Sequence, residues 1–247
     1  MNLALKDIKL QVEKEKQTIE VNEEADRIKS EIRKLSELTD PEKDGYNPNI
    51  LQIVNQAIIN IGNQTKIEDV VSEVTETNRL LGQVLLSAHR ANAKRILEKE
   101  KVRIETEMNQ LQGFTNRQTY LDLLDQEELK YHANIDQRNN INTVDYEKEQ
   151  GLQAYKQVLL NAQKAHSKEI LANKTAQLIN EINALETLNQ TEKDAYMERI
   201  NKLNNEASMG IDEVNTQALI DSIREKTLSS LQSEFNLASN QDEEKLG

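Results

Sequence analysis

Histidine is the residue whose spacing would most directly indicate a metal or acid–base site in this chain, and it occurs as His89, His132 and His166. The three are scattered, with no His-x-x-x-His pair and no Glu-x-x-His partner on the same helix face. Cysteine is absent, which excludes disulfides, thiolate metal sites and cysteine nucleophiles. We therefore interpret the histidines as surface residues and predict neither a metal site nor a cofactor.

The acidic residues offer one window with the spacing of a calcium loop. In residues 136–147 the first and twelfth positions are Asp136 and Glu147. An EF-hand loop has glycine at its sixth position and an oxygen ligand at its third, where this window has Arg138. We predict a loop between helices instead. Gly-rich phosphate loops, Gly-x-Ser-x-Gly and His-Glu-x-x-His are also missing from the sequence, so an enzyme is not expected.

The composition indicates helices with little core between them. Of 247 residues, 36% are hydrophobic, 30% charged and 3% aromatic, and only two are proline. Glu, Lys, Gln, Leu and Ala favour helices, so we predict an all-α fold. The net charge of −12 would repel phosphate backbones and anionic lipids, which argues against nucleic acid or a membrane surface as partner. No apolar run approaches the length of a membrane span, and residues 1–11 do not read as a signal peptide.

The chain repeats itself with a period of about 75 residues. QVLLSAHRANAKRIL, residues 83–97, returns as QVLLNAQKAHSKEIL, residues 157–171. A second apolar pattern occurs three times, as the sets Ile28, Ile32, Leu35 and Leu38; Ile104, Met108, Leu111 and Phe114; and Leu178, Ile182, Leu185 and Leu188. The sequence therefore contains three copies of one structural unit.

Helix starts recur at matching positions. A Ser, Thr, Asn or Asp followed three residues later by Glu or Gln has the spacing of a capping box, in which each side chain bonds the other residue's backbone N–H. The pairs are Thr39 and Glu42, Thr65 and Glu68, Thr115 and Gln118, and Asn189 and Glu192. In the first copy, Gly45 and Asn47-Pro48 restart the second helix.

Residues 66–112 and 143–187 contain no proline and no cluster of turn residues. The simplest interpretation is that the third helix of one copy continues as the first helix of the next, with the repeated fifteen residues at the splice. We predict tandem three-helix bundles joined by long shared helices into an elongated, monomeric rod. The expected domains are residues 1–88, 89–162 and 163–240, followed by a polar tail at 241–247.

The third copy contains Leu185, Leu188, Asn189, Lys193 and Ile200, then Asp-Glu-Val at 212–214 and ALIDSI at 218–223. With these residues it resembles the GA (albumin-binding) and FIVAR-like three-helix modules of giant staphylococcal extracellular-matrix-binding surface proteins. The resemblance implies an extracellular, cell-wall-anchored adhesin or stalk, anchored through parts outside this sequence, that binds host serum albumin, fibronectin or another matrix protein.

Tyr196 and Met197 are the candidate partner-binding anchors in the third copy, since a small helical face binds through a few apolar or aromatic side chains. Tyr196 matches Tyr46 at a shift of 150 residues, so a core role is the alternative. For the whole chain, the alternative is an intracellular helical scaffold, spectrin-like or coiled-coil. Sustained heptads without caps would favour that scaffold, whereas recurrent capping boxes favour compact bundles.

Overall fold

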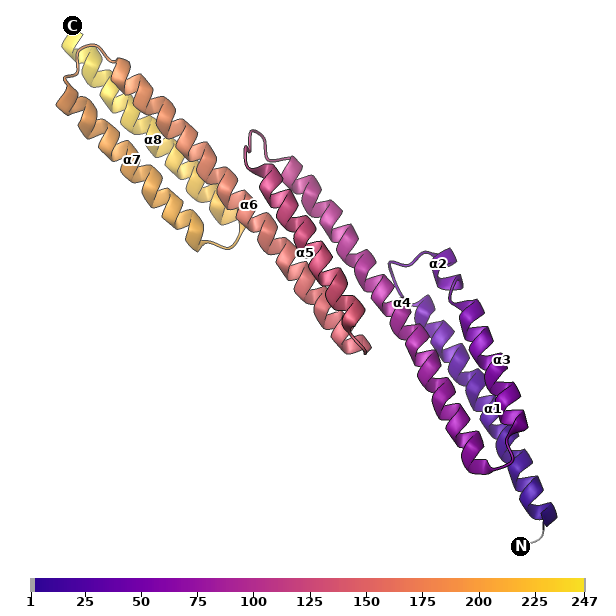
Figure 1. Ribbon diagram of the computed structural model, residues 1–247. Coiled ribbons are helices and arrows are strands. Elements are labelled where there is room, and N and C mark those ends of the chain that lie inside the picture. Colours follow the sequence, from indigo (N-terminus) through magenta and orange to yellow (C-terminus); the bar gives the residue numbers. More distant parts are fainter. Residues whose placement is uncertain (1–2, 247) are drawn as a thin grey trace. The chain divides into compact units, whose positions relative to one another are not determined.

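The computed structural model describes residues 3–246, and its elements there are all α-helices (Figure 1). In chain order they are α1 (Leu3–Arg33), α2 (Asp40–Asp44), α3 (Asn47–Asn63), α4 (Ile67–Asn109), α5 (Arg117–Gln137), α6 (Ile141–Ala184), α7 (Gln190–Glu213) and α8 (Gln217–Leu246). No strand occurs in this part of the chain. The predicted all-α fold is confirmed.

The two long shared helices are confirmed as α4 and α6, each of which runs without interruption (Figure 1). They contain 43 and 44 residues, or about 65 Å each at 1.5 Å per residue. The repeated segments 83–97 and 157–171 lie near the middle of these helices. Matching positions have matching burial: Ala88 and Ala162 are fully buried, as are Leu97 and Leu171.

The second helix of the first copy restarts at the predicted place. Helix α2 ends at Asp44, where the backbone N–H of Gly45 donates to the Pro41 carbonyl at 3.0 Å. Helix α3 then begins with Pro48 in its first turn, where a missing N–H costs no intrahelical hydrogen bond. Its N-cap is Tyr46, which makes no side-chain cap hydrogen bond.

The chain divides into two compact units, described here separately. The first comprises residues 1–100 and 128–152, and the second comprises residues 101–127 and 153–247. The boundaries of these units fall inside α4, α5 and α6, and the boundaries expected at residues 88 and 162 likewise lie inside α4 and α6. Residues 241–246, expected as a polar tail, continue α8 through Leu246; residue 247 lies outside the described part.

The core of the first unit is formed where α1 packs along α3, beside the first half of α4 (Figure 1). Its fully buried large side chains include Ile28, Ile50, Ile61 and Leu81. Each contributes about 1.5–3 kcal/mol relative to an exposed side chain. Ile28 belongs to an apolar set that the sequence predicted, because its members recur at the three- and four-residue spacing of one helix face.

In the second unit α7 packs along α8, and α6 supplies the remaining wall of the core. The buried residues are Leu171, Leu178, Ile182, Leu188, Ile200, Ala207, Ile211, Ile220, Leu231 and Ala238. They come from the same repeat positions as in the first unit: Ile200 stands 150 residues after Ile50, and Leu231 stands 150 after Leu81.

Gly151 in α6 allows a close approach of neighbouring side chains. A Cβ atom there would lie 2.9 Å from Leu97 Cδ2 and 3.2 Å from Tyr131 Cγ. The corresponding positions in the other two copies are Thr77 and Thr227, which are buried without such a conflict. In the middle copy, Leu97 and Tyr131 therefore occupy the space that the threonine side chain fills in the other two copies.

Gly151→Thr is expected to lower the free energy of unfolding by about 1–3 kcal/mol through overpacking, although it restores the residue of the other copies. The matched control is Gly82→Ala in α4, where no atom lies within 4 Å of the added Cβ. That control should stabilise by about 0.4–1 kcal/mol. Urea unfolding measures both variants, and equal stabilisation by the two would contradict the packing argument.

Candidate functional site

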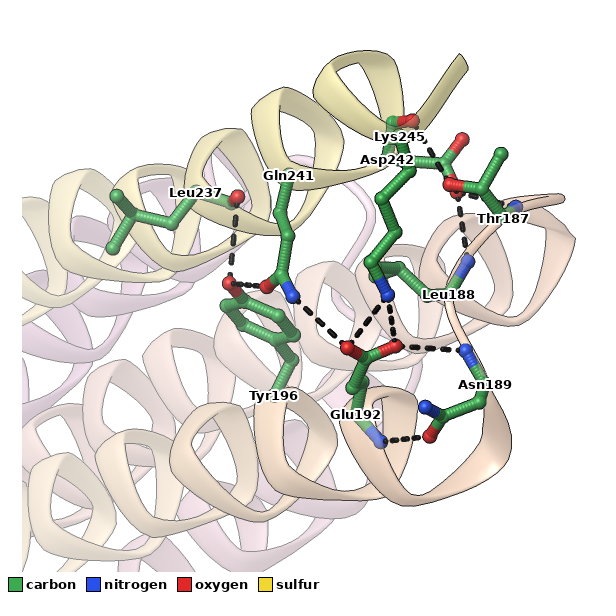
Figure 2. Close-up of polar contacts among 9 residues, drawn as sticks. All are labelled: Thr187, Leu188, Asn189, Glu192, Tyr196, Leu237, Gln241, Asp242 and Lys245. Atoms are coloured by element: carbon green, nitrogen blue, oxygen red, sulfur yellow. Dashed lines mark hydrogen bonds and ion pairs between the residues drawn. The ribbon is translucent and has the colours of Figure 1, made fainter.

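A polar cluster fixes the loop that joins α6 to α7 against helix α8 (Figure 2). Asp242 of α8 is 6% exposed. Its Oδ1 accepts from the backbone N–H of Thr187 at 2.7 Å and of Leu188 at 3.1 Å, and lies 2.7 Å from the Thr187 hydroxyl. These contacts fix the first interhelical loop of a copy to its third helix. We call such a set of contacts a first-loop anchor.

The start of α7 belongs to the same cluster. Asn189 and Glu192 form the predicted capping box, with each side chain bonded to the other residue's backbone N–H at 3.1 and 2.9 Å. Lys245 of α8 adds an ion pair to Glu192 at 2.6 Å (Figure 2). The Lys245 ammonium, followed by the Asn189 backbone, holds the pKa of Glu192 below its ordinary value.

The first copy carries the same anchor 150 residues earlier. Asn92 Oδ1 of α4 accepts from the backbone N–H of Glu37 at 2.9 Å, at the positions of Asp242 and Thr187. Thr39 and Glu42 form the predicted capping box. Arg95 pairs with Glu42 at 2.6 Å, as Lys245 does with Glu192. Hydrogen bonds from Arg95 and then from Thr39 lower the pKa of Glu42 to about 2.

The middle copy makes its anchor with the charges rearranged. Glu169 of α6 stands where the other copies have Arg95 and Lys245, and its carboxylate accepts from the backbone N–H of Thr115 at 3.1 Å and from the Thr115 hydroxyl. His166, at the position of Asn92 and Asp242, lies with Nε2 2.9 Å from the carbonyl oxygen of Gln112.

This rearrangement corrects the prediction of a capping box at Thr115 and Gln118. Gln118 directs its amide to Asp122 at 2.8 Å. The backbone N–H of Thr115, two residues before α5 begins, donates instead to Glu169, 54 residues further along the chain. The physical reason is electrostatic: a carboxylate is the stronger acceptor for a backbone N–H, and in this copy α6 supplies it instead of the third residue of the box.

Each copy also has a second anchor, at the end of its second helix. A basic side chain of the first helix donates to a backbone carbonyl there, 48 residues away in every case. The pairs are Lys14 with Gly62 at 2.8 Å, Arg90 with Arg138 at 3.1 Å from Nε, and Lys164 with Asp212 at 2.8 Å. Cations satisfy carbonyls that a helix C-terminus leaves without partners. The shared spacing was present in the sequence, but its meaning depends on helix positions that only the structure gives.

Two further sequence predictions need correction. Thr65 and Glu68 do not form a capping box, because α4 begins at Ile67 and its first hydrogen bond runs from Val70 N–H to Lys66 O at 3.3 Å. His166 is not a surface residue: it is 8% exposed, with its ring 5.4 Å from that of Phe114.

The other two histidines do not form a site with His166. His89 is partly buried, and burial lowers its pKa below the ordinary value. His132 has a buried Nε2 with no hydrogen-bond partner. Within residues 3–246, no three His, Cys, Asp or Glu side chains gather as metal ligands, and no helix there combines the length and apolarity that crossing a bilayer requires.

The proposed partner-binding residues Tyr196 and Met197 both pack against the core of the second unit. The Tyr196 hydroxyl donates to Gln241 Oε1 at 2.7 Å (Figure 2), and the Arg199 guanidinium lies 4.4 Å from the centre of its ring. These contacts are intramolecular. Tyr196 thus has the core-side role that its match to Tyr46 offered as the alternative.

A different surface, on α3, has the composition expected for protein contact. This helix has no charged residue in a chain that is 30% charged. Its exposed side chains include Leu51 at 57% and Ile59 at 57%. We call this surface of α3 the α3 face. A groove of about 620 Å³ lies between α1 and the end of α3, lined by Gln11, Lys14, Glu15, Thr18, Ile19, Ile58, Ile61 and Gly62.

One family model matches the chain, over residues 13–88, and it is described as a domain of unknown function, DUF1542. That domain is a repeat found in bacterial surface proteins, including staphylococcal ones. No curated protein and no solved structure matches the chain. The matched residues run from the third turn of α1 to the middle of α4 and end within the repeated segment 83–97.

Asp242→Ala should destabilise the second unit more than Asp242→Asn, because asparagine keeps one acceptor, as Asn92 does at the same position. Hydrogen bonds from Thr187, side chain first, hold the pKa of Asp242 below its ordinary value. The stabilisation is therefore complete above the unfolded pKa of about 3.9 and is lost as the pH falls through the folded pKa.

Thermal unfolding at pH 7 and at pH 2–3 measures this difference. The gap in unfolding midpoint between wild type and Asp242→Ala should be largest at pH 7 and shrink as the carboxyl becomes protonated. A gap that is the same at both pH values would show that the carboxylate charge contributes nothing to the anchor.

Proposed function

We propose that this chain is a repeat segment of a bacterial cell-surface protein, in which three-helix modules share long helices to form a non-catalytic stalk outside the cell. The observation that carries the proposal is the match of residues 13–88 to a repeat domain of bacterial surface proteins. The loop anchors support it, because a load-carrying segment needs its interhelical connections fixed to the helices. The GA-like residues of the third copy are consistent with the same class of protein.

A stalk must be extended, and small-angle X-ray scattering of the whole chain tests this. If each copy advances by its shared helix less the length of the returning second helix, a monomer should reach roughly 130–170 Å at 1.5 Å per residue. A maximum dimension near that of one shared helix, about 65 Å, would mean that the copies fold back on one another and would exclude a stalk.

A second function, adhesion to a host serum or matrix protein, is favoured by the α3 face. An uncharged helix with exposed isoleucine and leucine lets a partner approach without the repulsion that the net charge of −12 imposes elsewhere. Binding of the whole chain to serum albumin and to fibronectin is the measurement.

The variant Leu51→Glu/Ile59→Glu should abolish that binding, since it puts charges where the partner contacts apolar side chains. The matched control is Leu129→Glu on α5, which is 70% exposed and should bind as the wild type does. Equal loss in both variants, or no binding by the wild type, would leave only the stalk. The position of the chain outside the cell is tested separately, by a secretion signal and a wall-sorting signal in the parent gene.

A further inference from the structure

The first three turns of α1 present an apolar stripe to solvent. Leu5 is 45% exposed, Ile8 60% and Val12 59%. Their spacing of three and four residues places them on one face of the helix. We call these three residues the α1 stripe. Scattered apolar side chains on a surface are ordinary, but a spaced stripe of this kind is the pattern of a helix with a packing partner.

The repeat shows what the α1 stripe becomes elsewhere. Ile28, Ile104 and Leu178, all fully buried, fix the register: a shift of 76 residues from α1 to α4, and of 74 more to α6. The Leu5 position corresponds to Leu81, Tyr155 and Leu231, and the Val12 position to Ala88, Ala162 and Ala238. All six of these counterparts are 0% exposed.

The counterparts are buried by a specific partner. In α4 these positions lie in the second half of the third helix of the first copy, within a core that includes Leu38, Ile50 and Val54. Those residues come from the first interhelical connection and from α3, which is the second helix of that copy. In the first copy, the core that buries these positions is thus formed by the first helix, the first loop and the second helix of that copy.

A different face of α1 already serves the first copy. Leu10 packs against the core of the first unit, and Gln17 and Val21 follow on its side of the helix as buried residues. Leu160, the counterpart of Leu10 in α6, packs against the core of the second unit in the same way. Helix α1 therefore has both faces of a shared helix, with one face packed and the other uncovered.

We propose that the α1 stripe is one half of a joint, and that its partner is the first two helices of another copy of this repeat, joined ahead of α1. The inference rests on the register and burial of the repeat and does not depend on where the protein resides. The uncovered face continues past the stripe to Lys16 and Ile19, at the anchor positions of Asn92 and Arg95. The Lys16 side chain is 66% exposed and Ile19 is 59% exposed.

Cysteine reactivity gives a direct test, because the chain has no native cysteine. A copy of residues 3–80 is joined directly before Leu5, so that Leu80 precedes Leu5 as it precedes Leu81. The variant Leu5→Cys is then compared in the extended and the original chain. Modification of the thiol should slow by roughly tenfold or more on extension, since opening of the packed joint must precede reaction.

Two controls separate packing of the stripe from mere lengthening of the helix. Lys6→Cys, on a different face, should react equally fast in both chains. A second extended chain carries one additional alanine after Leu80, which rotates the stripe by about 100°; there Leu5→Cys should stay as reactive as in the original chain. Equal reactivity of Leu5→Cys with and without the extension, or equal protection in the rotated chain, would overturn the proposal.

Discussion

Ala91→Pro is expected to break α4 at the splice and to cost about 3 kcal/mol or more. Proline removes a backbone donor and its ring clashes with the carbonyl four residues earlier, in the middle of a helix that continues for 43 residues. Ala91 is partly buried and packs against the core of the first unit, whose fully buried side chains the substitution leaves in place. Repeat proteins couple mainly to their neighbours, so the remaining helices should still form.

Circular dichroism and amide hydrogen exchange measure this result. Most of the helical signal should remain, while exchange accelerates in the residues around position 91. The control is Ala91→Gly, which should cost only about 1 kcal/mol and leave the local exchange pattern largely intact. Loss of the whole helical signal in Ala91→Pro would show that the copies fold as one cooperative body and cannot be treated as modules.

The shared helices and the repeated core positions were predictable because they depend on short-range rules. The apolar spacing marks a helix face, and the lack of proline from 66 to 112 allows continuity. The boxes at Thr39 and Asn189 form as expected, because both partners lie within one turn. A capping box depends on two residues only three positions apart, so it can be predicted from the sequence alone.

The middle copy escaped prediction because its decisive contact is long-range. The Thr115 backbone N–H donates to Glu169 across 54 residues, and no local rule pairs them. A signal was nevertheless present: Gln118 replaces the glutamate of the other boxes, and Glu169 replaces the basic residue found as Arg95 and Lys245. The carboxylate is lost at one repeat position and gained at the other, so each copy still has a carboxylate that accepts a backbone N–H of the first loop.

The burial of His166 was missed for a related reason. The prediction of a surface residue rested on the absence of a second histidine or a glutamate on the same helix face, and that absence says nothing about burial. The structure shows that Asn92, His166 and Asp242 all contact the backbone of a first interhelical loop. The position has a conserved task within the chain, performed by three different side chains, so a search for identical residues could not find it.

Leu231→Ala is expected to lower the free energy of unfolding of the second unit by about 2–5 kcal/mol. Leu231 is 0% exposed within the core formed by α6, α7 and α8, and truncation leaves a cavity that the surrounding helices fill only in part. Leu5→Ala is the matched control, since it makes the same change at the same repeat position where the side chain is 45% exposed.

The control should change stability by no more than about 0.5 kcal/mol, because its side chain has no second helix to pack against. Urea unfolding of both variants gives the comparison. The two leucines have the same position in the repeat, so a large difference in cost would show that burial is set by the helices packed against that position and not by the residue itself. A cost for Leu5→Ala similar to that for Leu231→Ala would mean that the α1 stripe is already packed in solution, and the joint proposed for it would be wrong.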